Sequence, residues 1–546
     1  KKQIAVRVGH SGVNVSELKY SVYRVVIVVV NVPTFIVEHK HRTTEATVSP
    51  GFYSQKMERN RVLLCFSRRG FCRARNFLVL PTLAREGKDN RVDNVLESRG
   101  LTHSMGIAGA HALLPLGQKI VDKITRIIDA ELTSIGAQKM SVPSMCSKQP
   151  WEATGRWNKY GAALFRLRDR AGNQLCLGPT HEESFVECIA AISPNELTPK
   201  LPLKLYQTGW KYRDEPRPKQ GLLRAREFLM NDMYSFHSSK QDCENTYEEV
   251  TEAYKKIFTR IGVPFLRANA HSGDMGGALS HEYHCELPLG EDRLAECSRC
   301  QEYFNRDTLV RVGDFSRDNT AKDDAGDDSD LLSEFLSCPR CTGSLGPLRS
   351  CVEIGHTFVL GDLYTRALGA NCLVNNKKTP LEMGCYGIGV TRLLAAAVLL
   401  SSSSSSTTPS SRPLPVSIAP FTVAVVGPKQ GAKDFDEHTA IAEEVAAHLH
   451  KEILPNDRVI LDDRKWTIGR RLLEQRQCGT PYAVVVGKNG QLELNDLGVA
   501  SPDTHSTQGA SDSNACSETE PPFRIMADKS EVYDFFIKLR RRYDLL

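Results

Sequence analysis

Three short motifs follow one another in a fixed order, and together they restrict the fold of this chain more than any other feature. The first is the Thr-x-Glu of CLGPTHEE, at Thr180 and Glu182. The second is an Arg-x-Glu followed by an Arg-x-x-x-Phe, in YRDEPRPKQGLLRAREF. The third is the Gly-rich run GCYGIGVTR, at Gly384–Arg392. A Gly-rich run alone is typical of turns and packing contacts, because glycine lets the backbone approach another surface. The ordered combination predicts one shared site.

The side chains of these motifs suit the parts of an amino acid activated by ATP. Arg213 can neutralise an α-phosphate and hold a carboxylate beside it, since guanidinium is a permanent, bidentate cation. Glu215 can accept a hydrogen bond from an adenine amino group, and Phe228 can stack under the purine. Arg224 can reach the outer phosphates, and Arg392 offers a second phosphate clamp.

On these motifs the chain resembles the class II aminoacyl-tRNA synthetases, and within them the prolyl-tRNA synthetases of the bacterial and mitochondrial type. The resemblance runs from about Phe77 to about Gly487 and also covers WEATGRW, GEDRLA, EIGHTF and LDDR. CLGPTHEE together with GCYGIGVTR is typical of prolyl enzymes rather than of class II in general. The family's motif 1 would lie at Leu116–Pro143, with a helix to about Ile135, and its motif 2 at Lys211–Phe228. Motif 3 would be the Gly-rich run.

The resemblance implies an α/β fold class. We expect an α+β catalytic domain, built as the class II antiparallel sheet flanked by helices, and a C-terminal α/β anticodon-binding domain. It also implies ATP-dependent ligation of L-proline to tRNA(Pro) through a prolyl-adenylate, with Mg²⁺ as a cofactor. Because motif 1 builds the dimer interface in class II enzymes, we expect a homodimer. The net charge of +5 permits tRNA binding but does not demand it.

The resemblance assigns the site residues one by one. Thr-x-Glu is also a common helix N-cap fragment, and residues at alternate positions of a strand can be ordinary packing. Asp462, Asp463 and Arg464 of LDDR are expected to bind the anticodon. Arg213 and Arg392 are expected to be catalytic. The expected proline-binding residues are Thr180, Glu182, Arg213, Met230, Asp232, Tyr234, His356 and Cys385, and the expected ATP-binding residues are Arg213, Glu215, Arg224, Phe228, Gly387, Gly389 and Arg392.

Two other functions are compatible with parts of this pattern. A sister class II synthetase, for threonine, serine or glycine, would share the ATP-binding residues but not CLGPTHEE with GCYGIGVTR. A synthetase-like protein without catalysis, such as a DNA-polymerase accessory subunit or a tRNA-binding regulator, usually lacks the phosphate arginines. Arg213, Arg224 and Arg392 are all present, which favours an enzyme.

The first ninety residues differ in composition from the rest. Residues 1–56 carry no motif and are interpreted as an unmatched extension, which is either translated upstream sequence that is not native or a long, weakly structured arm. From Met57 to Arg75 there are six arginines and one acid, Glu58, among apolar residues. This composition is typical of a mitochondrial presequence, although a basic arm would look similar. We therefore interpret residues 57–90 as a targeting segment and lead-in, and expect a location in the mitochondrial matrix, with the cytoplasm as the alternative.

The later boundaries follow from local composition. Residues 91–400 are expected to form the catalytic domain, and residues 401–413, SSSSSSTTPSSRP, a linker with nothing to bury. In residues 414–546 expected strands alternate with expected helices, which indicates a compact α/β domain. The polar run 501–521 is expected to be a loop. No apolar run reaches the ~20 residues that a membrane-spanning helix needs, so no membrane association is expected.

Four cysteines have the spacing of a zinc site. Cys297-x-x-Cys300 and Cys338-x-x-Cys341 form two pairs that could hold a structural Zn²⁺ through four thiolates. The alternative is a set of reduced thiols left from an ancestral site. A disulfide framework is not expected, because the other cysteines are scattered and a matrix or cytosolic setting is reducing.

One segment is shorter than the resemblance would suggest. Bacterial-type prolyl enzymes generally carry a large editing domain between motifs 2 and 3. Here GED ends at Asp292, and the resemblance resumes near Cys351. The interval already holds both cysteine pairs and an acidic loop, so we expect that no editing domain is present.

Overall fold

The computed structural model describes two units of the chain, residues 1–70 and residues 71–546. In the first unit, β1 (Ala5–Arg7), β2 (Ile36–His39) and β3 (Arg42–Thr44) form an antiparallel sheet. Much of the expected extension and targeting segment, most of the linker, the acidic loop and the polar run lie outside the described residues. Those described are 5–7, 36–39, 42–44, 72–77, 92–270, 275–277, 279–306, 309, 338–402, 412–454, 458–498, 523–526 and 528–545.

A nine-stranded sheet forms the centre of the expected catalytic domain. Its order is β14-β13-β16-β15-β17-β20-β12-β11-β7, and β14 also pairs with β17. The middle strands β17, β20, β12 and β11 are antiparallel, which confirms the expected class II arrangement. The bounds are β7 (Gln138–Lys139), β11 (Leu203–Tyr212), β12 (Glu227–His237), β13 (Leu266–Asn269), β14 (Leu279–Glu286), β15 (Asp292–Glu296), β16 (Tyr303–Asn305), β17 (Arg349–Gly361) and β20 (Glu382–Gly389).

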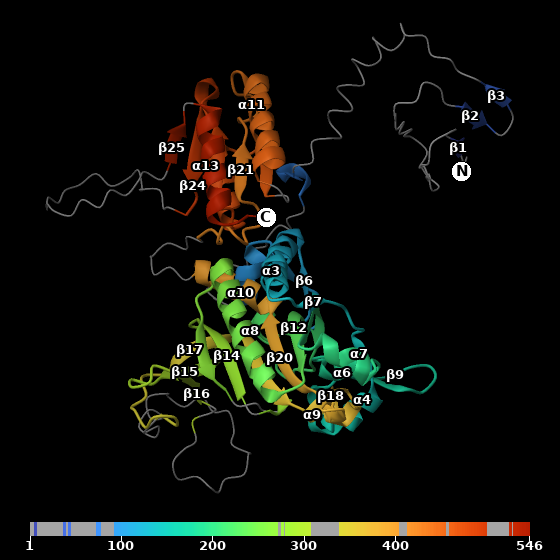
Figure 1. Cartoon of the computed structure of the whole chain (residues 1–546). Helices are drawn as coiled ribbons and strands as arrows, with labels where there is room; N and C mark the ends of the chain where they lie inside the picture. The colour runs from blue at the N-terminus through green and yellow to red at the C-terminus, as the bar shows by residue number, and fades with distance from the viewer. Residues whose placement is uncertain are drawn as a thin grey trace. The chain divides into compact units, whose positions relative to one another are not determined.

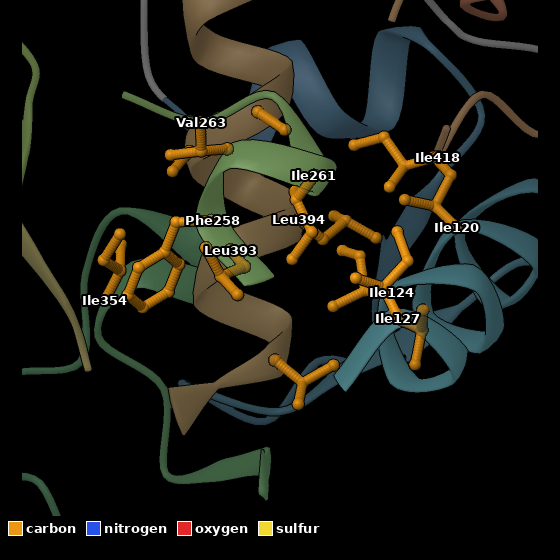
Figure 2. Packing of buried hydrophobic residues seen from close by; sticks show 14 of the residues in the cluster. Ile120, Ile124, Ile127, Phe258, Ile261, Val263, Ile354, Leu393, Leu394 and Ile418 are labelled. Carbon is orange, nitrogen blue, oxygen red and sulfur yellow. The ribbon is translucent and has the colours of Figure 1, made fainter. Parts of the chain in front are cut away.

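Two long helices contact the middle strands of this sheet, and a third packs against both of them (Figure 1). They are α3 (Pro115–Ser134), α8 (Lys240–Ile261) and α10 (Val390–Ser402). Apolar residues recur every three or four positions along α3, and this stripe faces the core. From Leu393 to Leu400 helix α10 is apolar on all sides, because it lies between α3 and the strands. Figure 2 shows Ile120 and Ile124 of α3, Phe258 of α8 and Leu394 of α10 among the residues of this one core cluster.

A smaller layer lies around the start of motif 2. Strands β8, β10 and β9 form an antiparallel sheet, and β10 leads through Gly178 into helix α6. Hairpins β5–β6 and β18–β19 complete the region. Its elements are α2 (Val92–Ser98), β5 (Thr102–Ser104), β6 (His111–Leu113), β8 (Met145–Ser147), α4 (Lys148–Ala153), α5 (Arg156–Lys159), β9 (Arg166–Arg168), β10 (Gln174–Leu177), α6 (Glu182–Ala190), α7 (Pro194–Leu197), α9 (Leu363–Leu368), β18 (Asn371–Val374) and β19 (Lys377–Pro380).

The C-terminal domain is the expected compact α/β domain. Its sheet has the order β25-β24-β23-β21-β22-β4, with β21, β22, β23 and β4 parallel. Strands β21, β22 and β23 are short apolar runs, as buried parallel strands require. The bounds are β21 (Val423–Val426), α11 (Phe435–His448), β22 (Val459–Asp462), α12 (Ile468–Gln477), β23 (Tyr482–Val486), β24 (Leu492–Asp496), β25 (Phe523–Met526) and α13 (Lys529–Arg542).

One strand of this sheet comes from the other end of the chain. Strand β4 (Cys72–Arg73) pairs with β22, and Arg73 forms ion pairs with Glu443 at 2.8 Å and with Asp463 at 3.0 Å. Composition had suggested a domain made of residues 414–546 alone. The pairing of β4 with β22 shows that residues near position 72 also belong to its sheet. The expected presequence Met57–Arg75 overlaps this strand at its C-terminal end.

Among the described residues, no helix combines the length and the apolar character that crossing a membrane requires.

Candidate active site

The strand register brings motif 2, motif 3 and the EIGHTF segment side by side. On neighbouring strands His356, Gly387 and Asp232 lie directly opposite one another. In the row that points to the same face, Phe358 and Cys385 lie opposite Tyr234. Because alternate residues of a strand share a face, both rows contribute to one surface. The sequence therefore places residues more than a hundred positions apart at one site through strand pairing.

This surface lines a cavity of about 360 Å³. With the exception of Tyr234, every residue expected to bind proline or ATP lines this cavity. It also takes in residues that sequence reasoning had not assigned, among them Tyr160, Met275 and Glu282. The lining includes Thr180, Glu182, Arg213, Glu215, Arg224, Phe228, Met230, Asp232, Glu353, His356, Cys385, Gly387, Gly389 and Arg392.

At one end of the cavity the lining carboxylate Glu182 belongs to a buried cluster of two carboxylates and one cation. Arg156 lies 2.9 Å from Glu182 and 3.0 Å from Glu183, and all three side chains are almost fully buried. Burial opposes ionisation of Glu182, but the charge of Arg156 and the hydrogen bonds from Thr180, Arg156 and the backbone together lower the pKa of that carboxyl. Burial raises the pKa of Glu183, which also accepts a hydrogen bond from Thr154 at 2.8 Å. With both carboxyls ionised, the cluster has a net negative charge.

Thr180 and Cys385 are directed at the same carboxylate. The Thr180 hydroxyl donates to Glu182 at 2.6 Å, and the Cys385 thiol donates to it at 3.3 Å. Burial raises the pKa of Cys385 well above its ordinary value, and the charge of Glu182 adds to this. Cys385 is therefore a neutral thiol, which agrees with the expectation that it is not a nucleophile.

A buried network lies beneath the cavity floor. Lys211 pairs with Asp232 at 2.6 Å and lies 2.8 Å from Nδ1 of His181. The Tyr234 hydroxyl donates to Asp232 at 2.9 Å and accepts from the backbone N–H of His181. Tyr234 is fully buried, so its hydroxyl holds the Thr180–Glu182 loop from behind. This differs from the expectation that Tyr234 lines the proline pocket, because its ring lies between Phe185 and the sheet.

The other end of the cavity is cationic and aromatic. The guanidinium of Arg213 lies 5.2 Å from the centre of the Phe228 ring, a cation–π distance. Arg224 pairs with Glu215 at 2.7 Å and with Glu291 at 2.8 Å. These pairs are partly exposed, so an incoming ligand can displace them at low cost.

A third group of charges stands beside this end. Arg392 lies 3.0 Å from Glu353, whose carboxylate also receives a hydrogen bond from His356 at 3.1 Å. Glu282 lies 3.8 Å from the same histidine nitrogen. Each of Glu282, Glu353 and His356 offers one potential ligand atom, and these three atoms lie within 4.8 Å of one another. Two carboxylates with an imidazole can hold a divalent cation.

The glycines of motif 3 have two different roles. A Cβ at Gly384 would lie 2.3 Å from the Tyr386 hydroxyl and 2.7 Å from Ser235 Oγ, so this glycine permits close packing. A Cβ at Gly387 would meet nothing closer than 3.8 Å. Gly387 therefore keeps cavity space open rather than relieving a clash.

The expected anticodon-binding residues are mostly engaged within the protein. Asp462 is fully buried and receives hydrogen bonds from Arg464 at 2.9 Å and from Gln475 at 3.0 Å. Its carboxylate orients Arg464 and offers no surface to an RNA, contrary to the sequence-based expectation. Asp463 is paired with Arg73 and with Arg75, both at 3.0 Å. These contacts are tertiary, so the LDDR motif alone could not reveal them.

The two cysteine pairs meet as their spacing predicted. The Sγ atoms of Cys297 and Cys341 are 3.4 Å apart, and those of Cys300 and Cys338 are 3.7 Å apart. All four lie within 4.8 Å of one another. The backbone N–H groups of Arg299 and Arg340 each donate to the first sulfur of their pair at 3.4 Å.

Several residues of the site escaped sequence reasoning. Arg156 belongs to WEATGRW, a segment quoted for the resemblance without a role for its arginine. Its position between two tryptophans in the sequence was the available signal. Glu282 and Lys211 carried no such signal, because their partners lie on other strands.

Comparison with known proteins agrees with the geometry. The family model described as tRNA synthetase class II core domain (G, H, P, S and T) matches residues 165–400, and the model described as anticodon binding domain matches residues 421–517. The chain is 38% identical over 414 residues to the probable proline--tRNA ligase, mitochondrial, of Homo sapiens, covering 73% of this chain and 80% of the relative. It is 37% identical over 414 residues to the protein of that name from Schizosaccharomyces pombe, covering 74% and 90%.

A bacterial relative and a solved structure extend the comparison. The proline--tRNA ligase of Anaplasma phagocytophilum is 33% identical over 399 residues, covering 72% of this chain and 88% of the relative. The structure of Giardia lamblia prolyl-tRNA synthetase in complex with prolyl-adenylate aligns with a TM-score of 0.60 at 17% identity. It covers 83% of this chain and 80% of the other chain, and this likeness supports the fold.

Proposed function

The chain belongs to the proline--tRNA ligases of the class II aminoacyl-tRNA synthetases, and we propose that it joins L-proline to tRNA(Pro) through a prolyl-adenylate. The observation that carries this proposal is the cavity, which has an anionic end for an ammonium and a cationic, aromatic end for a nucleotide. The anticodon-binding domain supplies the expected contact with the tRNA.

The anionic end suits the secondary ammonium of proline. Glu182 and Glu183 share the single charge of Arg156, so with both carboxyls ionised one further cation neutralises the cluster. An ammonium there completes the pairing that buried carboxylates require. Thr180 donates its proton to Glu182, which leaves its oxygen lone pairs to accept from the substrate. Met230 and Phe358 supply apolar lining for the ring.

The cationic end suits ATP. Arg213 is positioned to hold the proline carboxylate and the α-phosphate together, and Phe228 offers its other face to adenine. Glu215 exchanges its pairing with Arg224 for the adenine amino group, which leaves Arg224 to meet the outer phosphates. Arg392 neutralises the same phosphates from the motif 3 side.

In the activation step, a proline carboxylate oxygen attacks the α-phosphorus while the bond to the departing pyrophosphate breaks. The protein contributes alignment and charge neutralisation rather than a covalent nucleophile. The 3′-terminal ribose hydroxyl of the tRNA then takes the prolyl group, and AMP leaves.

The test is ATP–pyrophosphate exchange measured with each amino acid in turn. We expect exchange that depends on proline. Arg213→Ala should reduce it by about 10²–10⁴, because a charge-assisted bidentate contact to the reacting groups is lost. Arg168→Ala, at an exposed position of β9, is the matched control and should exchange normally. Exchange with another amino acid, or normal exchange in Arg213→Ala, would contradict the proposal.

Mg²⁺ fits beside the phosphate end. Glu282 and Glu353 would hold it, because oxygen ligands suit this ion, with His356 adjacent. When bound, the ion would supply positive charge to the outer phosphates. Replacing Glu282 with Gln should raise the Mg²⁺ concentration needed for exchange, and an unchanged requirement would remove this residue from the ligand set.

A structural Zn²⁺ fits the four cysteines. In a tetrahedral site with Zn–S bonds of ~2.3 Å, the sulfurs stand ~3.8 Å apart, close to the observed separations of 3.4 and 3.7 Å. The backbone N–H groups of Cys300 and Arg299 lower the pKa of Cys297 to about 6, as a thiolate ligand requires. Metal analysis of anaerobically purified protein should find one Zn²⁺ per chain. Its release by Cys297→Ser with Cys338→Ser would support the site, and its absence from the wild type would exclude it.

We also propose a homodimer through motif 1. Strand β7 lies at the edge of the nine-stranded sheet with exposed side chains, and Met105 and Ile107 are 60% and 65% exposed. Unpaired strand edges and exposed apolar groups are features that a subunit interface buries. Sedimentation should show a dimer at micromolar concentration; a fully active monomer would contradict it.

A mitochondrial location is supported by the composition of residues 57–75 and by the mitochondrial relatives. A fusion of residues 57–90 should carry a reporter into mitochondria, and a cytosolic reporter would favour the cytoplasm.

A further inference from the structure

Two cysteines beside the proposed proline pocket have no role in the proposed reaction. Cys146 on β8 and Cys176 on β10 lie directly opposite each other in the antiparallel ladder. Their side chains are 6% and 0% exposed. They are not joined by a disulfide, and the Cys176 thiol hydrogen-bonds to the sulfur of Cys146.

The backbone geometry allows these sulfurs to be joined. The N–H of Gly178 donates to the carbonyl of Ser144 at 2.8 Å, and hydrogen-bonded pairs recur every second residue of an antiparallel ladder. Cys146 and Cys176 therefore form a pair of this kind, for which the Cα separation is ~5.5 Å. Disulfides span ~4.4–6.8 Å between Cα atoms. The Cα separation expected for this pair therefore lies within the range that a disulfide spans.

The surroundings of Cys146 favour its reactive form. The hydrogen bond from Cys176 and the neighbouring His181 outweigh burial and lower the pKa of Cys146 to about 4. Lys211 donates to Nδ1 of His181 at 2.8 Å, so Nε2 carries the imidazole proton. A Cβ built on Gly178 would lie 2.6 Å from Nε2 of His181 and 3.3 Å from the sulfur of Cys146, so both atoms lie on the same side of this glycine. The thiolate is the form of cysteine that attacks oxidants.

We infer that Cys146 and Cys176 are a modification site for hydroperoxides, and that the disulfide formed there weakens proline binding. The Cys146 thiolate attacks hydrogen peroxide, so that an S–O bond forms, the O–O bond breaks and hydroxide takes a proton to leave as water. The Cys176 sulfur then attacks the Cys146 sulfur, the S–S bond forms, and the S–O bond breaks. Its oxygen leaves as a second water with the Cys176 proton. Two thiols are oxidised and one peroxide is reduced to two waters.

The pair is connected directly to the residues proposed to hold the ammonium. Strand β10 continues through Gly178 into Thr180 and Glu182. The Cys146 sulfur lies 3.7 Å from Ser184 Oγ, in the first turn of α6, which begins at Glu182. When the disulfide forms, Cys146 loses its negative charge. The imidazole Nε2–H of His181, the residue between Thr180 and Glu182, then loses its neighbouring anion. Loss of this favourable charge beside a buried N–H disfavours the loop conformation that presents Thr180 and Glu182.

The test uses the full-length protein with hydrogen peroxide as the oxidant, stopped with catalase. Peptide mapping by mass spectrometry without reductant should show the peptides of Cys146 and Cys176 linked. The KM for proline should rise about tenfold, which corresponds to ~1.4 kcal/mol, while the KM for ATP changes little. Dithiothreitol should reverse both changes. Cys146→Ser and Cys176→Ser should keep their KM through the treatment, and Cys188→Ser, at an exposed position of α6, should respond as the wild type does.

Three results would overturn the inference. They are the absence of the linked peptide, a linked peptide with an unchanged KM, and equal peroxide sensitivity in Cys146→Ser. If the serine variants do not fold by circular dichroism, Cys146→Ala and Cys176→Ala are judged by the same criteria. The coupling to proline rests on the proposed function, but the linkage does not. Absence of proline-dependent exchange before oxidation would therefore contradict the proposed function, while peptide mapping would still decide whether the disulfide forms.

Discussion

Arg156 is the residue on which the anionic end of the cavity depends. It lies among two carboxylates and over the rings of Trp151, Tyr160 and Tyr364, at 4.8–5.6 Å from their centres. Without it, Glu182 and Glu183 would be buried like charges with no cation between them, until a substrate ammonium arrives. This guanidinium therefore stabilises the empty pocket in a form that can still accept one more positive charge.

We predict that Arg156→Leu destabilises the protein by about 3–5 kcal/mol, the cost of leaving buried charges unpaired. Adding Glu183→Gln should recover part of this loss, because one of the two carboxylates is then neutral. Urea denaturation of the wild type, the single variants and the double variant forms the cycle that measures the coupling. Equal losses in Arg156→Leu with and without the second change would show that these groups do not interact.

His237 gives the stability of the fold a dependence on pH. It is fully buried at the end of β12, and neither ring nitrogen has a hydrogen-bond partner among the described residues. Burial lowers its pKa from 6.5 to about 4, with Asp242 opposing the shift and Lys204 adding to it. The unfolded chain therefore binds the proton first as pH falls. The contribution of neutral His237 to the free energy of unfolding is complete above about pH 6.5, and it is lost progressively as the pH falls toward 4.

We predict that replacing His237 with Phe makes stability less sensitive to acid. As the pH falls from about 6.5 to about 4, the wild type should lose on the order of 1–3 kcal/mol more of its free energy of unfolding than the variant does. The slope of this difference is at most ~1.4 kcal/mol per pH unit. Denaturation midpoints measured at several pH values give the comparison. Parallel curves for the two proteins would mean that His237 titrates normally in the folded state.

Strand β4 joins the beginning of the second unit to the C-terminal domain. Arg73 and Asp463 are 390 positions apart in sequence, and Phe77 meets Phe421 edge to face at 5.5 Å. The strand covers the edge of β22, which would otherwise present unpaired backbone groups. A targeting signal that is removed after import would have to end before Cys72 for this strand to remain.

We predict that a chain beginning at Phe71 is more stable than one beginning at residue 78. The difference should be roughly 1–3 kcal/mol in the C-terminal domain, because partly buried ion pairs and one aromatic contact are lost. Thermal unfolding of the two truncated proteins tests this, and Arg73→Glu in the longer one separates the ion pairs from the strand. N-terminal sequencing of mature protein from mitochondria should find a start before Cys72; a start beyond Phe77 would exclude a role for β4.

The sequence predicts elements better than it predicts their partners. Helix α3 was expected at 116–135 and spans Pro115–Ser134, and strands alternate with helices from β21 to β23, as expected for residues 414–546. Motif residues such as Arg213 and Phe228 were found because their spacing is local. Arg156, Glu282 and β4 were not, because their roles arise from contacts between elements far apart in sequence. Tyr234 and Asp462 were assigned to ligands for the same reason: burial behind a loop or a strand is decided by the tertiary fold.

The length between motifs 2 and 3 bears on the fidelity of the proposed enzyme. After Asp292 the structure describes β15, β16 and the cysteine cluster before β17 begins at Arg349. Residues 310–337 between the two cysteine pairs are too few for a domain with a core of its own. Alanine is smaller than proline and can enter the same pocket, where each missing methylene is worth only ~1–3 kcal/mol of discrimination.

We therefore predict that the protein forms some alanyl-tRNA(Pro) and does not clear it. Preformed alanyl-tRNA(Pro) should lose its amino acid no faster with the protein than without it, whereas prolyl-tRNA(Pro) formation proceeds in the same preparation. A bacterial-type enzyme that carries the editing domain is the positive control and should hydrolyse the same substrate. Deacylation faster than the rate without enzyme would show that the short interval does not exclude editing. If Arg213→Ala deacylates equally fast, the hydrolytic site lies outside the activation cavity. If instead no deacylation occurs, discrimination against alanine must come from the shape of the pocket around Met230 and Phe358 or from a separate deacylase.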